Sequence, residues 1–159
     1  TITANGFKLE SKVNIVPSKE VLYVTTGTCI TSGNKLSVVN KLMRDIYASS
    51  VATSRGGAAW DLFVDMLRNE KRHRTIYVVG LVGIVLIEQT PENLTMKFTK
   101  SEGIYDFWAG TGGAFLMEAL QLMPKDVQRA FEITAHMDHM TSIAHEVYDI
   151  KKLLTKLKV

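Results

Sequence analysis

Two histidines near the end of a predicted helix have the spacing of transition-metal ligands. His136 and His139 lie one helical turn apart, so a helix places both side chains on one face. No cysteine pair and no Glu-x-x-His motif accompanies them, and histidines are common near helix ends. The sequence therefore predicts neither a metal site nor a bound cofactor.

The single cysteine, Cys29, excludes an internal disulfide and fits a reducing compartment. Cys29 follows a predicted strand and has no histidine near it in the sequence, so we do not expect a catalytic thiol. Methionines at helical positions, such as Met117 and Met137, are interpreted as core residues.

A glycine-rich turn stands between a predicted strand and a predicted helix. It reads Gly110-Thr111-Gly112-Gly113, and its glycines permit positive φ angles, so the simplest interpretation of Thr111 is a turn residue. Further along the chain, Asp138 has two simple interpretations: it caps the end of the preceding helix, or it lies exposed.

Basic residues exceed acidic ones only slightly, 19 against 16, for a formal charge of +3. The excess lies mainly in residues 68–74 (RNEKRHR) and in residues 151–158 (KKLLTKLK). Neither run interleaves aromatic with basic residues, as a groove for single-stranded nucleic acid does. We predict a solvated helix end and a basic amphipathic tail, and no nucleic-acid partner.

The chain has 159 residues, 46% hydrophobic and 22% charged, which is ordinary composition for one globular domain. Its longest apolar run, Ile76 to Ile87, has 12 residues, whereas a bilayer span needs about 20. No charged leader followed by an apolar stretch is visible. We therefore expect a soluble protein that is not secreted.

Two β-rich blocks alternate with helices along the chain. Alternating apolar residues around Pro17-Ser18-Lys19 predict a β-hairpin over residues 13–24. The remaining predicted elements are strands at 36–47 and 50–54, a helix at 58–71, strands between 75 and 109, helices at 114–122 and 126–139, and a strand at 145–150 before a short helical tail.

This order separates strands from helices, which argues against a parallel βαβ sheet. Two mostly antiparallel sheets stacked face to face, with helices outside, would bury both β blocks. We predict an α+β protein with a four-layer α/β/β/α sandwich, formed by a single domain at residues 11–159 after an N-terminal extension at residues 1–10.

Several segments, taken together, resemble proteasome β-subunits and bacterial HslV-type peptidases, which have the N-terminal-nucleophile hydrolase fold. Trp108 to Leu120 is similar to that family's Gly-Ser-Gly-Gly turn and the helix after it. Residues 138–142 (DHMTS) look like its Asp-x-x-Ser-Gly segment. The resemblance also includes the strand and loop at 20–34, Lys41 near the family's active-site lysine, and the Gly56-Gly57 entry to a helix.

The resemblance implies a catalytic site for a threonine peptidase. In that family the first residue is the nucleophile and its own α-amine is the base. Carried over to this sequence, Thr1 would be the nucleophile and Lys41 would lower the pKa of its amine. An N–H near Gly112 would bind the oxyanion with the Thr111 hydroxyl beside it, and Asp138 and Thr141 would position the N-terminus.

Three departures from the family pattern favour a subunit that has lost catalysis. Ungapped spacing puts the nucleophile position at Glu10 or Ser11, and Thr25-Thr26-Gly27 carries no carboxylate where the family has an aspartate. The predicted helix at 58–71 also runs almost directly into the next strand, which leaves no second outer helix.

The first hypothesis is therefore a non-catalytic structural subunit, as proteasome α-subunits are. It would form a homo-oligomeric ring or join other protein subunits in a larger particle, for example a virion. The alternative is a self-compartmentalising peptidase that uses Thr1. Both hypotheses imply a cytoplasmic location or one inside an assembled particle, with no membrane partner.

Overall fold

The computed structural model describes residues 2–3, 7–8, 13–28, 30, 34–101, 108–141, 143 and 146–157. The chain forms two compact units, each built from two separate stretches of sequence. The first unit contains Thr1–Lys12 and Ile104–Asp149, and the second contains Val13–Gly103 and Ile150–Val159. Short strands form at Ile2–Thr3 and Phe7–Lys8, inside the predicted extension; the division into residues 1–10 and 11–159 stays a prediction.

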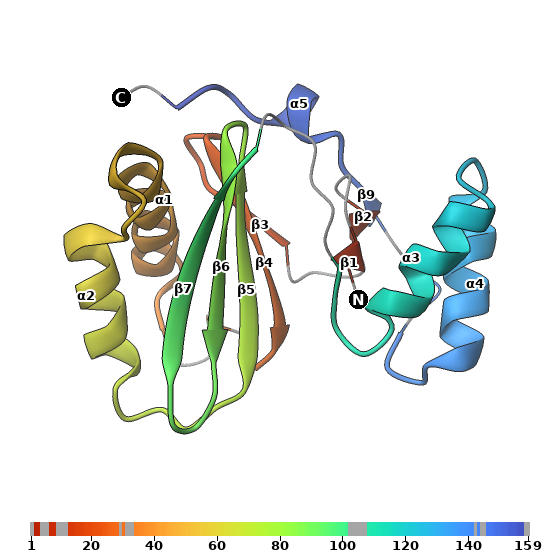
Figure 1. The fold of residues 1–159 in the computed structure, drawn as a ribbon, viewed down its shortest axis with the longest axis horizontal. Coiled ribbons are helices and arrows are strands. Elements are labelled where there is room, and N and C mark those ends of the chain that lie inside the picture. The colour runs from red at the N-terminus through yellow and green to blue at the C-terminus, as the bar shows by residue number, and fades with distance from the viewer. Residues whose placement is uncertain are drawn as a thin grey trace. The chain divides into compact units, whose positions relative to one another are not determined.

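The second unit is built on a five-stranded antiparallel sheet whose strands lie in sequence order (Figure 1). The predicted hairpin is confirmed: Val13 pairs with Val24 across a turn in which Lys19 takes a φ of 57°. Short turns also join the last three strands, so most pairings in this sheet are local. The strands are β3 (Val13–Ile15), β4 (Val21–Gly27), β5 (Arg74–Gly80), β6 (Gly83–Gln89) and β7 (Leu94–Lys100).

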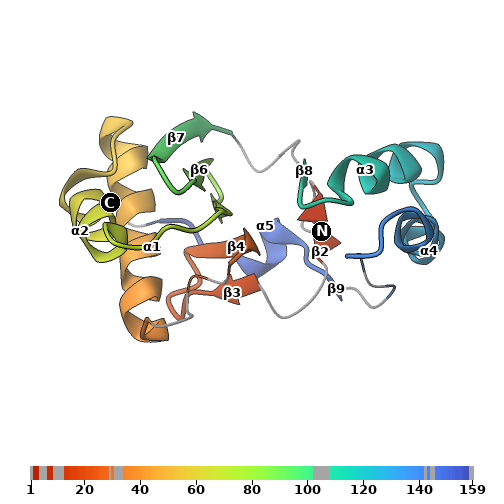
Figure 2. The same ribbon diagram turned by 90° about the horizontal axis from the view of Figure 1, so that it is seen from below.

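Two helices between β4 and β5 cover one face of this sheet (Figures 1 and 2). They are α1 (Leu36–Thr53) and α2 (Gly57–Leu67). The predicted strands at 36–47 and 50–54 are therefore wrong. The buried residues of α1 recur every three or four positions, which is the period of a helix, and this period outweighs the strand preference of the β-branched residues in the segment. They are Val39, Leu42, Met43, Ile46, Tyr47 and Ser50.

The expectation that one outer helix is missing is also wrong. It rested on the short connection after the helix predicted at 58–71, and that helix is confirmed as α2, which ends at Leu67. The second helix of the layer comes before it in the chain, as α1. The helix layer thus contains two helices although the path from α2 into β5 is short.

The core of the second unit lies between the sheet and the helix pair. Tyr47 of α1 is fully buried, and its ring lies against Gly80, where a side chain would collide with it. The Tyr47 hydroxyl accepts a hydrogen bond from the backbone N–H of Val82 at 3.1 Å. Burial raises the pKa of the Tyr47 phenol above its usual value. This contact fixes α1 over the β5–β6 turn.

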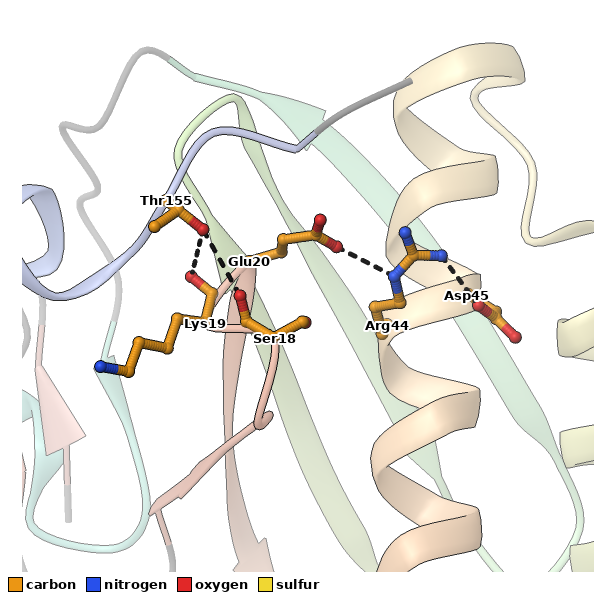
Figure 3. A network of polar contacts seen from close by, with 6 residues as sticks. All are labelled: Ser18, Lys19, Glu20, Arg44, Asp45 and Thr155. Carbon is orange, nitrogen blue, oxygen red and sulfur yellow. Dashed lines mark hydrogen bonds and ion pairs between the residues drawn. The ribbon is translucent and has the colours of Figure 1, made fainter.

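The C-terminal segment belongs to the same unit. It starts with α5 (Ile150–Leu153) and continues to Leu157, and it buries Leu154 and Leu157 while Lys156 is exposed, as the predicted amphipathic tail requires. Figure 3 shows that Thr155 contacts the β3–β4 turn, where its Oγ1 donates to the Lys19 carbonyl at 3.3 Å and lies 3.5 Å from the Ser18 carbonyl. The Thr155 N–H also donates to the Lys19 carbonyl, at 2.8 Å. From that turn Glu20 reaches Arg44 of α1 at 2.9 Å.

The first unit combines a small antiparallel sheet with two helices. Its strand order is β8-β1-β2-β9, so residues from the start of the chain lie between strands from its second half. The predicted helices at 114–122 and 126–139 are confirmed as α3 and α4, and Asp126 caps α4 by accepting from the Arg129 N–H at 3.1 Å. The elements are β1 (Ile2–Thr3), β2 (Phe7–Lys8), β8 (Trp108–Ala109), α3 (Gly113–Leu122), α4 (Val127–Met137) and β9 (Glu146–Val147).

The fold class is therefore α+β with antiparallel sheets, as predicted. The face-to-face stacking of a four-layer sandwich stays a prediction. Among the helices in the described ranges, none is long and apolar enough to cross a bilayer.

Candidate functional site

The glycine turn after β8 leads directly into α3. Gly110 takes a φ of 85°, and the N–H of Gly113 closes the turn on the Gly110 carbonyl at 3.2 Å. Gly112 and Gly113 are buried, and a side chain at Gly113 would collide with the Trp108 ring. The turn presents the exposed Thr111 beside the first residues of a helix, where backbone N–H groups lack partners within the helix.

Asp138 draws two hydroxyl groups together. It follows the last residue of α4, and its Oδ2 accepts from Thr111 Oγ1 and from Thr141 Oγ1, each at 2.7 Å. Its Oδ1 accepts from the Met140 N–H at 3.3 Å. The hydrogen bonds from Thr141 and Thr111 lower the pKa of the Asp138 carboxyl below its usual value, so this group is ionised at neutral pH.

This arrangement fixes the hydrogen-bonding role of both threonines. A hydroxyl has one proton and two lone pairs, and here each proton is directed at Asp138. Any further hydrogen bond to either hydroxyl oxygen has to come from a donor. The group Thr111–Asp138–Thr141, the threonine–aspartate cluster, is therefore suited to contact a protonated amine or another N–H donor.

β1 and β8 place the beginning of the chain close to this turn. Ile2 pairs with Ala109, the residue before Gly110, and Thr3 pairs with Trp108. Thr1, the predicted nucleophile, lies outside the described residues, as does Cys29. The sequence resemblance assigned Thr111, Gly112, Asp138 and Thr141 to one site; the structure places them in one unit, where both threonines donate to Asp138 and Gly112 follows Thr111 in sequence.

Lys41 belongs to the second unit, on α1 rather than on a strand. Its side chain is exposed at a groove of about 770 Å³ between α1 and α2. Asp45 and the apolar Leu62 line the same groove. Its assigned role as the lysine that tunes the N-terminal amine stays a prediction.

The histidines of the C-terminal half lie on the surface of the first unit. His136 is in the last turn of α4, His139 follows Asp138, and both are exposed. Within the described ranges, no three His, Cys, Asp or Glu side chains are grouped so that they could hold a metal ion.

Sequence reasoning missed a buried arginine. Residues 68–74 were predicted to form a solvated helix end, but Arg74 opens β5 with a side chain only 1% exposed. Its Nη1 contacts Glu70 Oε2 at 3.0 Å and Gln89 Oε1 at 2.9 Å, and its Nε donates to the Thr28 carbonyl at 3.1 Å. The sequence did contain a signal: Arg74, Ile76 and Val78 are spaced two apart, so in a strand they share one face, and the two apolar residues mark that face as buried.

Known proteins resemble this chain only weakly. No protein-family profile matches the chain, and no curated protein sequence matches it. Among solved structures, one match is eukaryotic HslV from Trypanosoma brucei, at 14% sequence identity and a TM-score of 0.47. That match covers 86% of this chain and 79% of the HslV chain. At such low similarity, the architecture rests on this chain's own strands, helices and contacts.

Proposed function

We propose that this protein is an N-terminal-nucleophile amide hydrolase of the threonine-peptidase type, with the four-layer sandwich of that class. Thr1 Oγ attacks a peptide carbonyl, and the α-amine of Thr1 accepts the hydroxyl proton. A backbone N–H near Gly112 stabilises the oxyanion of the tetrahedral intermediate. As the intermediate collapses, the protonated α-amine returns its proton to the leaving nitrogen and the amine product is released; water then hydrolyses the ester on Thr1 and restores its hydroxyl.

The threonine–aspartate cluster is the observation that carries this proposal. An N-terminal nucleophile needs its α-amine held in one orientation, because the amine serves as the base. Asp138 is ionised and directs the protons of Thr111 and Thr141 toward itself, so the oxygen of the exposed Thr111 hydroxyl is an acceptor for an N–H donor. An α-amine is such a donor.

The pairing of β1 with β8 supports the same proposal. Ile2, the neighbour of Thr1 in sequence, pairs with Ala109 and so lies beside the turn that contains Thr111. Consecutive Cα atoms are about 3.8 Å apart, so a nucleophile at the first position needs no long linker to reach this turn.

A second candidate function is a non-catalytic assembly subunit. It is favoured by the position of Lys41, an exposed residue of α1. It is also favoured by the end of β4, where Thr25-Thr26-Gly27 provides no carboxylate that could orient a lysine. In this case the threonine–aspartate cluster would only fix the α4 end against the glycine turn.

Covalent labelling separates the two candidates. A peptide epoxyketone reacts with a residue that offers both a hydroxyl and a free α-amine, and intact-mass spectrometry detects the adduct. We expect one adduct per chain with Thr1 free, none with Thr1→Ala, and none when a single glycine precedes Thr1 and converts its amine to an amide. Thr3→Ala is the matched control, because it removes a nearby threonine hydroxyl and leaves Thr1 intact.

Asp138→Asn tests the positioning role, and it should slow labelling without changing the labelled residue. If the free-Thr1 protein gives no adduct while circular dichroism shows that it is folded, the peptidase proposal is wrong and the assembly subunit is favoured.

We further propose a homo-oligomeric ring, located in the cytoplasm or inside an assembled particle such as a virion. Native mass spectrometry of the full chain tests the ring, and a monomer at micromolar concentration would contradict it.

A further inference from the structure

The connection between α2 and β5 exposes three consecutive basic side chains. We call residues 71–73 the basic connector; it consists of Lys71, Arg72 and His73, and all three are exposed. No ion pair among the described residues involves Lys71 or Arg72. The nearest carboxylate in sequence, Glu70, is already paired with the buried Arg74.

The first end of the basic connector is fixed to the sheet. Gln89, at the end of β6, is buried and donates from Nε2 to the Glu70 carbonyl at 3.1 Å. The same Gln89 accepts from Arg74 Nη1 at 2.9 Å, and Arg74 holds the Glu70 carboxylate at 3.0 Å. Glu70 is therefore held through both its backbone and its side chain.

The second end is fixed to the end of β4. The His73 carbonyl accepts from the Thr28 N–H at 3.2 Å, and Arg74 Nε donates to the Thr28 carbonyl at 3.1 Å. Gly27 has a φ of 85°, and any side chain there would collide with the His73 carbonyl. Only a glycine allows this close approach of the two backbones.

A surface connection anchored at both ends by a buried arginine needs an explanation. Buried ion pairs contribute little net stability, because desolvating the charges offsets their attraction, and they are better at fixing one geometry. Here they hold the backbone on both sides of three exposed basic residues. Binding to a pre-ordered segment avoids the entropy cost of ordering it.

We propose that the basic connector is a docking site for an acidic peptide segment of a partner protein. Three residues span at most about 10 Å, which limits the contact to two or three carboxylates of a short peptide. A nucleic acid would use a longer basic track with aromatic side chains for stacking, and residues 68–74 contain no Phe, Tyr or Trp. This docking site is independent of the proposed peptidase activity.

Fluorescence anisotropy with a labelled hexaglutamate peptide tests the site on the full chain. We expect salt-dependent binding that falls at least tenfold in the double variant Lys71→Glu/Arg72→Glu. The matched control is Lys125→Glu/Lys151→Glu, which makes the same change in net charge at two other exposed lysines and should bind like wild type. A labelled six-nucleotide oligo-dT of similar charge should bind more weakly than the peptide.

Three results would overturn the proposal: no peptide binding by the wild-type chain, equal loss in both double variants, or tighter binding of the oligonucleotide. Gln89→Ala tests the role of the anchor, since it leaves every basic residue in place. We expect weaker peptide binding at a temperature where circular dichroism shows the variant folded. Unchanged affinity in this variant would refute the pre-ordering argument.

Discussion

Arg74→Met removes the charge that joins the ends of β4, β5 and β6 while it keeps an apolar stem of similar length. Arg74 is 1% exposed and donates to Gln89 Oε1 and to the Thr28 carbonyl. Gln89 is itself only 4% exposed, so its oxygen would lose its donor in a place that water hardly reaches. Glu70 is 30% exposed, and water can solvate its carboxylate once the arginine is gone.

The expected loss follows from these contacts. A buried acceptor left without a donor costs about 1–3 kcal/mol; Gln89 Oε1 is such an acceptor, and the Thr28 carbonyl, in a partly buried contact, also loses its donor. Breaking a buried ion pair from one side typically costs about 3–5 kcal/mol, but the partial exposure of Glu70 reduces that figure. We expect Arg74→Met to lower the free energy of unfolding by about 2–4 kcal/mol, a large share of the stability of a domain.

Urea unfolding followed by circular dichroism and tryptophan fluorescence measures this loss. Arg68→Met is the matched control, because Arg68 pairs with Asp65 on the surface and both side chains are more than half exposed. Such a pair contributes about 0–1 kcal/mol. The double variant Arg74→Met/Gln89→Leu should lose less free energy of unfolding than the two single variants lose together, since both buried partners become apolar. If Arg74→Met and Arg68→Met unfold at the same urea concentration, the account of Arg74 as a buried anchor is wrong.

Three further predictions concern single residues. Thr25 is 2% exposed and its Oγ1 has no hydrogen-bond partner among the residues that the structure describes, so Thr25→Val should raise the free energy of unfolding by about 1 kcal/mol in urea titrations; a decrease would mean that the hydroxyl is hydrogen-bonded in solution. Hydrogen bonds from Thr141 and Thr111 lower the pKa of Asp138 in the folded protein, so its ionised form stabilises the fold above the usual aspartate pKa of about 3.9, and this stability is lost as the pH falls through the lower folded pKa. Asp138→Asn should therefore lower the melting temperature at pH 7 and differ progressively less from wild type toward pH 3, whereas a constant difference would contradict this linkage. Gly80→Ala places a methyl group against the Tyr47 ring and should cost about 1–3 kcal/mol in thermal unfolding, and a neutral effect would show that the ring can move aside.

Local patterns in the sequence were sufficient for much of the secondary structure. The hairpin around Lys19 and the helices α3 and α4 follow from turn residues, capping and periodicity within a few positions. For α1 the signal was present but misinterpreted: β-branched residues favoured a strand, while the spacing of Val39, Leu42 and Ile46 is that of a helix. The misinterpretation also produced the apparent loss of an outer helix.

For the candidate site too, the sequence identified residues, and the packing of the elements decided which of them touch. The resemblance to a known family selected Thr111, Asp138 and Thr141 from the sequence, but their types and spacing alone did not show that they touch. Thr111 and Asp138 come from different elements, and only the packing of the glycine turn against the end of α4 brings their oxygens to 2.7 Å. Lys41 lies in a segment that was predicted to be a strand, and the structure shows it as an exposed residue of α1.

The sequence by itself determined the class of the protein: an α+β chain of ordinary composition, with antiparallel hairpins and no long apolar helix, because these properties depend on residues close together in the chain. Only the tertiary structure decided which distant segments meet. It paired Ile2 with Ala109, buried Arg74 among residues of three strand ends, and directed two threonine protons at Asp138. Such contacts join residues far apart in sequence, so they depend on how whole elements pack and leave no local pattern that predicts them.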